Sequence, residues 1–201
     1  AAKAYVIQAG STLVRSIPAL SSAGVVVYVQ GKWHHSKTIV LGKDSKIIVL
    51  PKGELNVESI DLNGGTAAVE NHGDILLNSL TINANNSFRS TGTLKVIGAV
   101  TMLGKAEFVN YQKDVKVKIG SLTMQGSDAV VTNNGEIEIL VGTFHDGTLN
   151  ANCYTTVGRM TANQATINIW SDALLDVTNL HAEGSTFNLY TRAVLDVTKQ
   201  G

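Results

Sequence analysis

Two stretches at the end of the chain, TINIWSDALLDVTNLHAEGS (166–185) and TFNLYTRAVLDVTKQG (186–201), are copies of one unit. Laid over each other at an offset of 20 residues, they place Ile167 on Phe187 and repeat the tetrad Leu-Asp-Val-Thr. A fixed period of this size is typical of a solenoid, in which each unit buries its apolar face against the next unit.

The repeat continues upstream as short apolar-x-apolar pairs. They stand at steps of 20, 20 and 22 residues: Ile60/Leu62, Leu80/Ile82, Val100/Met102 and Leu122/Met124. Two further apolar runs lie between successive pairs, separated by Gly, Asn, Asp and Ser. Strict alternation, as in VKVKI (115–119) and EIEI (136–139), indicates strands with one buried face. Each unit is therefore predicted to form three short strands.

These patterns predict an all-β fold, a single-stranded right-handed parallel β-helix with 20–22 residues per coil and little or no helix. A left-handed solenoid normally shows a hexapeptide rhythm of small apolar residues, which this chain lacks. Residues 1–23 lack the repeat and are expected to cap the first coil, while residues 24–201 form the repeats of one structural domain. The segment 142–164 is less regular, which favours a bulge or a loop insertion there.

Inward positions of the repeat predict the core, and Asn-rich turns predict amide ladders between coils. The predicted core residues are Val27, Val29, Ile48, Leu50, Leu62, Ile82, Val117, Ile137, Ile139, Ile167, Ile169 and Leu189. The candidate ladder residues are Asn78, Asn83, Asn110, Asn133 and Asn134.

Composition narrows the class of partner. Sixteen basic residues balance sixteen acidic ones, so neither nucleic acid nor an anionic membrane is expected to bind. No run of 18 apolar residues occurs, so no transmembrane segment is predicted. Cys153 is the single cysteine, which rules out an intramolecular disulfide.

The runs VVVYVQGKW (25–33) and IIVLPKGELNV (47–57) resemble the β-solenoid portion of Bacteroidales cell-surface proteins of the LruC-domain type. The resemblance covers residues 24–57 well and the remainder as a style of repeat. It implies an exported, adhesive protein at the outer-membrane surface or outside the cell. The acidic motif of the LruC-type domain has no counterpart here, so the function of that domain does not carry over.

The expected function is a non-enzymatic structural or adhesive module that binds glycans or other surface ligands, without catalytic residues or cofactors. The alternative is a carbohydrate-active β-helix enzyme, a polysaccharide lyase or a glycosidase, which would need two carboxylates in one cleft. Asp176 and Asp196 stand 20 residues apart and should stack one coil apart. Because they alternate with apolar residues and lack a basic neighbour, a solvated outer face is favoured over catalysis.

A second group of candidate ligand-binding residues is Trp33, His34 and His35. An indole ring stacks on sugars, and imidazoles bind metal ions. Adjacent residues of a strand point to opposite faces, however, so the two histidines are not expected to share an ion. We therefore predict a surface corner and no metal site.

The repeat is unfinished at residue 201, which predicts a segment of a longer protein. An uncovered last coil also predicts end-to-end self-association, because its strand edges and apolar side chains lack partners.

Overall fold

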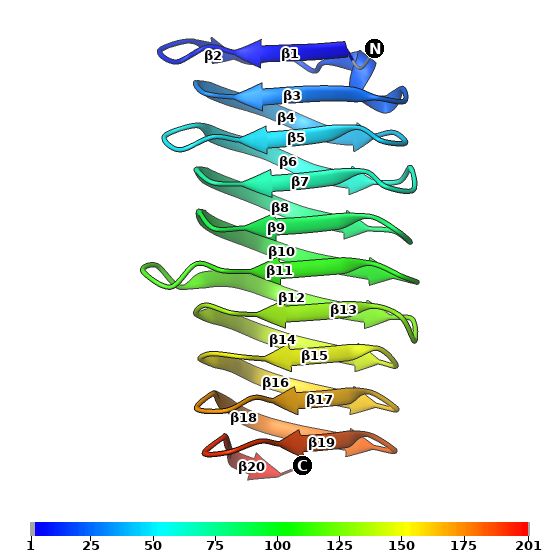
Figure 1. Cartoon of the computed structure of the whole chain (residues 1–201), viewed down its shortest axis with the longest axis vertical. Helices are drawn as coiled ribbons and strands as arrows, with labels where there is room; N and C mark the ends of the chain where they lie inside the picture. Colours follow the sequence, from blue (N-terminus) through cyan, green and yellow to red (C-terminus); the bar gives the residue numbers. More distant parts are fainter. Residues whose placement is uncertain (1–2, 201) are drawn as a thin grey trace.

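The chain winds into a rod of ten coils, with two parallel ten-stranded sheets along one axis (Figure 1). The computed structural model describes residues 3–200. In Figure 1 the front strands run to the left and the rear strands to the right as the chain descends, so the winding is right-handed. The predicted right-handed parallel β-helix is confirmed.

Each coil gives one strand to each sheet. The short-strand sheet contains β1 (Lys3–Ile7), β3 (Val25–Val29), β5 (Lys46–Val49), β7 (Ala68–Asn71), β9 (Ser87–Ser90), β11 (Glu107–Asn110), β13 (Val130–Asn133), β15 (Thr148–Ala151), β17 (Thr166–Ile169) and β19 (Thr186–Leu189). The long-strand sheet contains β2 (Thr12–Leu13), β4 (Lys32–Leu41), β6 (Glu54–Leu62), β8 (Asp74–Ile82), β10 (Thr93–Leu103), β12 (Val117–Gln125), β14 (Ile137–His145), β16 (Thr155–Asn163), β18 (Leu174–Glu183) and β20 (Val194–Gln200). The helical element among the described residues is one 3-10 turn, η1 (Pro18–Ser21).

The predicted three strands per coil are two in the structure, because two of the runs join into one long strand that bends. In β6, Leu55 and Val57 point inward, Glu58 and Ser59 turn the corner, and Ile60 points inward again. Two consecutive outward residues shift the alternation by one position, which lets both halves of the strand line the same core.

One apolar core runs through the rod and includes a stack of Phe88 on Phe108, with ring centroids 5.4 Å apart. Nine of the predicted core residues are buried: Val27, Val29, Leu62, Ile82, Val117, Ile137, Ile139, Ile167 and Ile169. Ile48 and Leu50 are only partly buried, because Ile47 and Val49 take the inward positions of β5. Leu189 is 52% exposed because it lies in the last coil.

The segment 142–164 is regular, and the predicted bulge or loop insertion there is wrong. Its strands stay in register with their neighbours, as in the pairing of β14 with β16. The coil is short: Val130 pairs with Thr148, 18 positions on, whereas Glu107 pairs with Val130, 23 positions on. The apolar positions therefore drift from a 20-residue template, although the strands themselves are intact.

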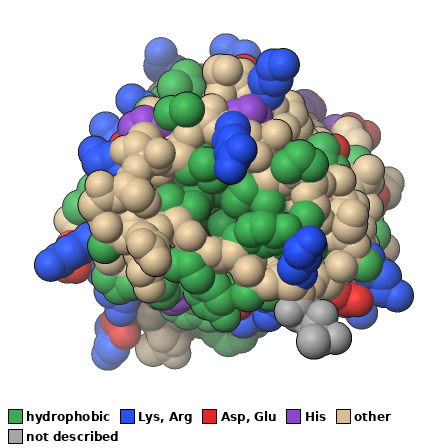
Figure 2. Space-filling model, turned by 90° about the horizontal axis from the view of Figure 1, so that it is seen from above, with side chains coloured by type: hydrophobic (Ala, Val, Ile, Leu, Met, Phe, Trp, Pro, Cys, Tyr) green, Lys and Arg blue, Asp and Glu red, His purple; other side chains and the backbone are tan. Residues whose placement is uncertain are grey.

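Residues 3–22 form the first coil. β1 pairs with β3 and β2 with β4, in the same parallel sense as all later coils. Seen from this end, apolar side chains gather in a central hollow that is surrounded mainly by backbone and other side chains, drawn in tan (Figure 2). The hollow measures about 460 Å³ and is lined by β1, β2 and residues up to Ala19.

Candidate binding surfaces

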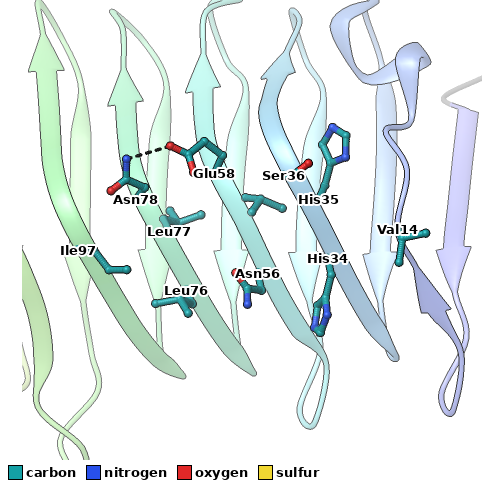
Figure 3. A pocket seen from close by; sticks show the side chains of 11 residues that line it. Val14, His34, His35, Ser36, Asn56, Glu58, Leu76, Leu77, Asn78 and Ile97 are labelled. Atoms are coloured by element: carbon teal, nitrogen blue, oxygen red, sulfur yellow. Dashed lines mark hydrogen bonds between the residues drawn. The ribbon is translucent and has the colours of Figure 1, made fainter.

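A groove of about 440 Å³ follows the bend of the long-strand sheet from β4 to β10 (Figure 3). Apolar side chains and polar side chains both line it, and they are Val14, His34, His35, Ser36, Asn56, Val57, Glu58, Leu76, Leu77, Asn78 and Ile97. Within the groove, Asn78 Nδ2 donates to Glu58 Oε1 at 3.0 Å. We call it the corner groove.

The corner groove lies between two strands that carry one extra residue at the bend. The register of β4 with β6 shifts between His35 and Thr38, and that of β10 with β12 shifts between Val96 and Ala99. In β6 and β8, by contrast, the bend is regular and in register. Such bulges redirect side chains. The bulged corners carry Ser36 and Ile97, which lie at the two sides of the groove in Figure 3.

Glu54 fixes the position of one imidazole at this groove. His34 Nε2 lies 2.6 Å from Glu54 Oε1, and Lys32 Nζ lies 2.9 Å from Glu54 Oε2. The hydrogen bond from Lys32, followed by that from His34, lowers the pKa of the Glu54 carboxyl. The carboxylate therefore stays charged and holds the His34 ring against β6.

The two adjacent histidines do not converge. Figure 3 shows the rings of His34 and His35 pointing away from each other on the two sides of the bend. Within residues 3–200, no group of three or more His, Cys, Asp or Glu side chains is placed to hold a metal ion. The geometry thus gives this pair of imidazoles no common ligand position.

Trp33 is excluded as a sugar-stacking residue, which corrects the expectation from the sequence. Its side chain is fully buried at the inward position that Leu55 takes in the next coil. The indole Nε1 donates to the carbonyl of Arg15 at 3.0 Å. The ring therefore closes the first coils of the core instead of facing a ligand.

Asp176 and Asp196 lie where the 20-residue offset places them. They are register partners on β18 and β20, on the outer face of the long-strand sheet. Asp176 is half-buried and Asp196 is exposed. In the preceding coil, the register partner of Asp176 is Thr156. The described strands therefore place no basic residue next to the two carboxylates in this column.

A column of threonines occupies the other half of the long-strand sheet. Five consecutive coils carry one outward threonine each, in register: Thr81, Thr101, Thr123, Thr143 and Thr161. Asp61 precedes the column as the partner of Thr81, and burial raises the pKa of its carboxyl. β-branched side chains are stiff and suit a pleated surface, so this column is explained by sheet stability.

The short-strand sheet carries an arrangement that the sequence reasoning missed. Asn188 Nδ2 donates to Asn168 Oδ1 at 2.8 Å, and Asn168 Nδ2 donates to Asn150 Oδ1 at 2.9 Å. Beside this amide ladder, Trp170 stacks on Tyr190 with ring centroids 4.2 Å apart and an interplanar angle of 4°. We call these five residues the aromatic-amide surface. The signal was available, since the 20-residue offset that aligns the last two units also aligns Trp170 with Tyr190.

Comparisons of the chain with family models, with curated proteins and with solved structures give no match. None of the helical structure in residues 3–200 has the length and apolar character that crossing a membrane requires.

Proposed function

We propose that this protein is a non-enzymatic structural and adhesive module of a cell surface, which binds glycans through the aromatic-amide surface. The observation that carries the proposal is the exposed Trp170–Tyr190 stack beside the ladder of Asn150, Asn168 and Asn188. Flat aromatic rings and fixed amides are the two kinds of group that recognise the apolar face and the hydroxyls of a sugar.

The aromatic rings remain available although they stack on each other. Trp170 is 40% exposed and Tyr190 is 41% exposed. The indole Nε1 points at Asn150 Oδ1, 3.3 Å away, which ties the ring to the amide ladder. Exposed large apolar side chains held rigidly in this way are typical of binding sites, because little side-chain entropy is lost on binding.

The amides supply hydrogen bonds in fixed directions. An amide has two N–H donors and an oxygen that accepts twice, so each rung retains bonding capacity after the ladder bonds are made. The ladder bonds also hold each amide in one orientation. A ligand therefore meets donors and acceptors that are already positioned.

The cell-surface setting rests on the resemblance of residues 24–57 to exported Bacteroidales solenoids, and on a rod shape that holds binding groups away from an attachment point (Figure 1). Export to the outer-membrane surface or the extracellular space is part of the proposal.

The second candidate, a carbohydrate-active enzyme, draws on the alignment of Asp176 with Asp196. Carboxylates one coil apart are separated by about the inter-strand spacing of 4.8 Å, near the separation of about 5–5.5 Å in retaining glycosidases. The pair lies on an open sheet face, while the corner groove is lined by residues of the first coils, Val14 to Ile97. The acids and the corner groove thus lie on different coils, which favours binding over turnover.

The test is a glycan array probed with the wild-type chain, with Trp170→Ala/Tyr190→Ala and with Tyr111→Ala. Tyr111 is a matched control, since it is 47% exposed at the equivalent position after β11 and has no aromatic stacking partner among the described residues. We expect the wild type and the control to bind, and the double variant to lose binding. Wild-type silence across the array would overturn the proposal, and release of reducing ends would establish the enzyme instead.

A further inference from the structure

The groups at and beside the aromatic-amide surface indicate the charge of its ligand and the direction in which the ligand lies relative to the solenoid axis. This step rests on the proposed function, because it assumes that a glycan binds there. Three further groups flank the ladder: Thr148, Thr166 and Thr186 occupy the neighbouring outward column in register with each other. Asn152 follows β15 as Trp170 follows β17, so it takes the same column one coil earlier. The area therefore consists of hydroxyl, amide and aromatic groups.

Arg192 lies in the turn after Tyr190, and its guanidinium is already engaged. Arg192 Nε lies 2.5 Å from Asp172 Oδ1, and Arg192 Nη2 donates to Asp172 Oδ2 at 2.8 Å. The two residues follow Trp170 and Tyr190 by two positions, in the turns beside the aromatic stack. The carboxylate thus occupies the Nε and Nη2 donors of the guanidinium bidentately and balances its charge.

We infer that the aromatic-amide surface binds a neutral glycan chain laid along the solenoid axis, and that Asp172 discriminates against acidic glycans by holding Arg192. A uronic acid or a sulfated sugar would need a free cation to replace the water lost from its charge. Here the guanidinium of Arg192 is paired, and its charge is balanced by the Asp172 carboxylate. A neutral sugar meets no such penalty.

The direction follows from the repeat. Along the axis, each coil presents the same set of groups, one threonine, one asparagine and one large or polar side chain, at a spacing of about 4.8 Å. Across the axis, the same ligand would meet three different columns and then the edge of the sheet. A polymer lying along the axis can therefore repeat one mode of contact in β15, β17 and β19.

This arrangement predicts a dependence on chain length. The ladder from Asn150 to Asn188 spans two inter-strand steps, or about 10 Å. Affinity should rise with each added sugar until the chain spans this distance, and then level off. A ligand bound through one terminal sugar would show no such rise.

The experiment measures binding of two matched oligosaccharide series, one neutral and one containing uronic acids, by titration calorimetry at low and high salt. The wild type should bind the neutral series, with affinity rising to a plateau with length. Asp172→Asn frees Arg192, and we expect it to gain roughly tenfold in affinity for the acidic series, an effect that salt removes. Its affinity for the neutral series should stay unchanged.

Glu107→Gln is the matched control. It frees Arg89, which is paired with Glu107 on the same sheet (Nη2 to Oε1, 2.8 Å) but lies several coils from the aromatic stack. This variant should gain nothing for the acidic series.

The outcomes separate the two levels of the proposal. Preference of the wild type for acidic chains, no gain in Asp172→Asn, or an equal gain in Glu107→Gln would overturn the inference while the glycan-binding function stands. Failure of the wild type to bind either series would count against the proposed function itself.

Discussion

Asp176 and Asp196 face each other across strands β18 and β20, so two carboxylates of like charge stack on the outer face of adjacent coils. Their alignment follows from the 20-residue offset of the last two units. Like charges directly opposite in a sheet are destabilising. The pair therefore lowers the stability of the folded protein.

The double variant Asp176→Asn/Asp196→Asn should leave glycan binding intact, because the pair lies away from the aromatic-amide surface. Removal of the repulsion should raise the free energy of unfolding slightly, by about 0.2–1 kcal/mol. Denaturant titration and the glycan array measure the two effects. Loss of a glycan-degrading activity in this variant would make the acidic pair a catalytic site.

Ile169→Ala should destabilise the protein by about 2–5 kcal/mol, because its side chain is fully buried and the neighbouring coils cannot collapse into the void. Leu189→Ala is the control at the register partner of Ile169, where the side chain is 52% exposed. It should cost much less. Chemical denaturation midpoints compare the two variants, and equal costs would contradict the stacking register.

The fold was predictable because a solenoid repeats one pattern, so errors in single coils average out. Register within a coil was less certain, since a shift of one residue exchanges the two faces of a strand. For this reason the sequence pattern predicts Ile48 and Leu50 in the core, although Ile47 and Val49 fill it in the structure. Bends were also missed, because two outward residues in a row look like a break between strands.

The binding surfaces were harder to predict, because they depend on which coils lie next to each other. The corner groove arises from bulges in β4 and β10, which a pattern of apolar residues does not reveal. An aromatic residue next to two histidines suggests an exposed position, so the prediction for Trp33 is wrong. Trp33 stands an even number of positions from Val29, and the alternation of inward and outward side chains therefore places both side chains inward. Four of the candidate ladder amides bond an amide of a neighbouring coil: Asn110 bonds Asn133 inside the corner, and Asn83 bonds Asn63 and Asn134 bonds Asn152 at the surface. Asn78 bonds Glu58 instead.

Asn133→Ala should cost more than a typical surface substitution, because it removes a buried bridge between coils. Asn133 Oδ1 accepts a hydrogen bond from Asn110 Nδ2 at 2.9 Å, and Asn133 Nδ2 donates to the carbonyl of Tyr154 at 3.0 Å. Each buried partner left unsatisfied costs about 1–3 kcal/mol. Asn134→Ala, one residue on and half-buried, is the control for thermal unfolding, because it removes an amide bond between coils at the surface, from Asn152 Nδ2 to Asn134 Oδ1 at 2.6 Å. Equal melting temperatures of the two variants would show that burial adds nothing to the cost of losing the amide.

Asp61→Asn should stabilise the protein at neutral pH. Burial raises the pKa of the Asp61 carboxyl above its ordinary value, so the folded state holds the proton more tightly than the unfolded chain. The wild type therefore loses stability as pH rises through the two pKa values, whereas the amide does not. Unfolding free energies at several pH values should show the gain of Asp61→Asn at pH 7 and its disappearance below the ordinary pKa of an aspartate. A gain that is independent of pH would contradict burial as the cause.

The end coils should promote association between copies of the chain. At one end Leu189 is 52% and Val194 is 50% exposed, and at the other an apolar hollow opens beside β1 (Figure 2). The outer edges of β1 and β19 have no strand partner among residues 3–200, and both belong to the same parallel sheet. A second copy stacked head to tail would continue that pairing in the same direction, which gives an open, concentration-dependent polymer and no closed dimer.

Light scattering across a concentration series should show this growth, and Leu189→Lys should suppress it by placing a charge in the apolar end. Leu140→Lys is the matched control, since Leu140 is 59% exposed at a corner in the middle of the rod. It should leave association unchanged, because a side chain at that position takes no part in end-to-end contact. Strictly monomeric behaviour at high concentration, together with slow amide exchange throughout residues 186–198, would show that the last coil is stable without a neighbour.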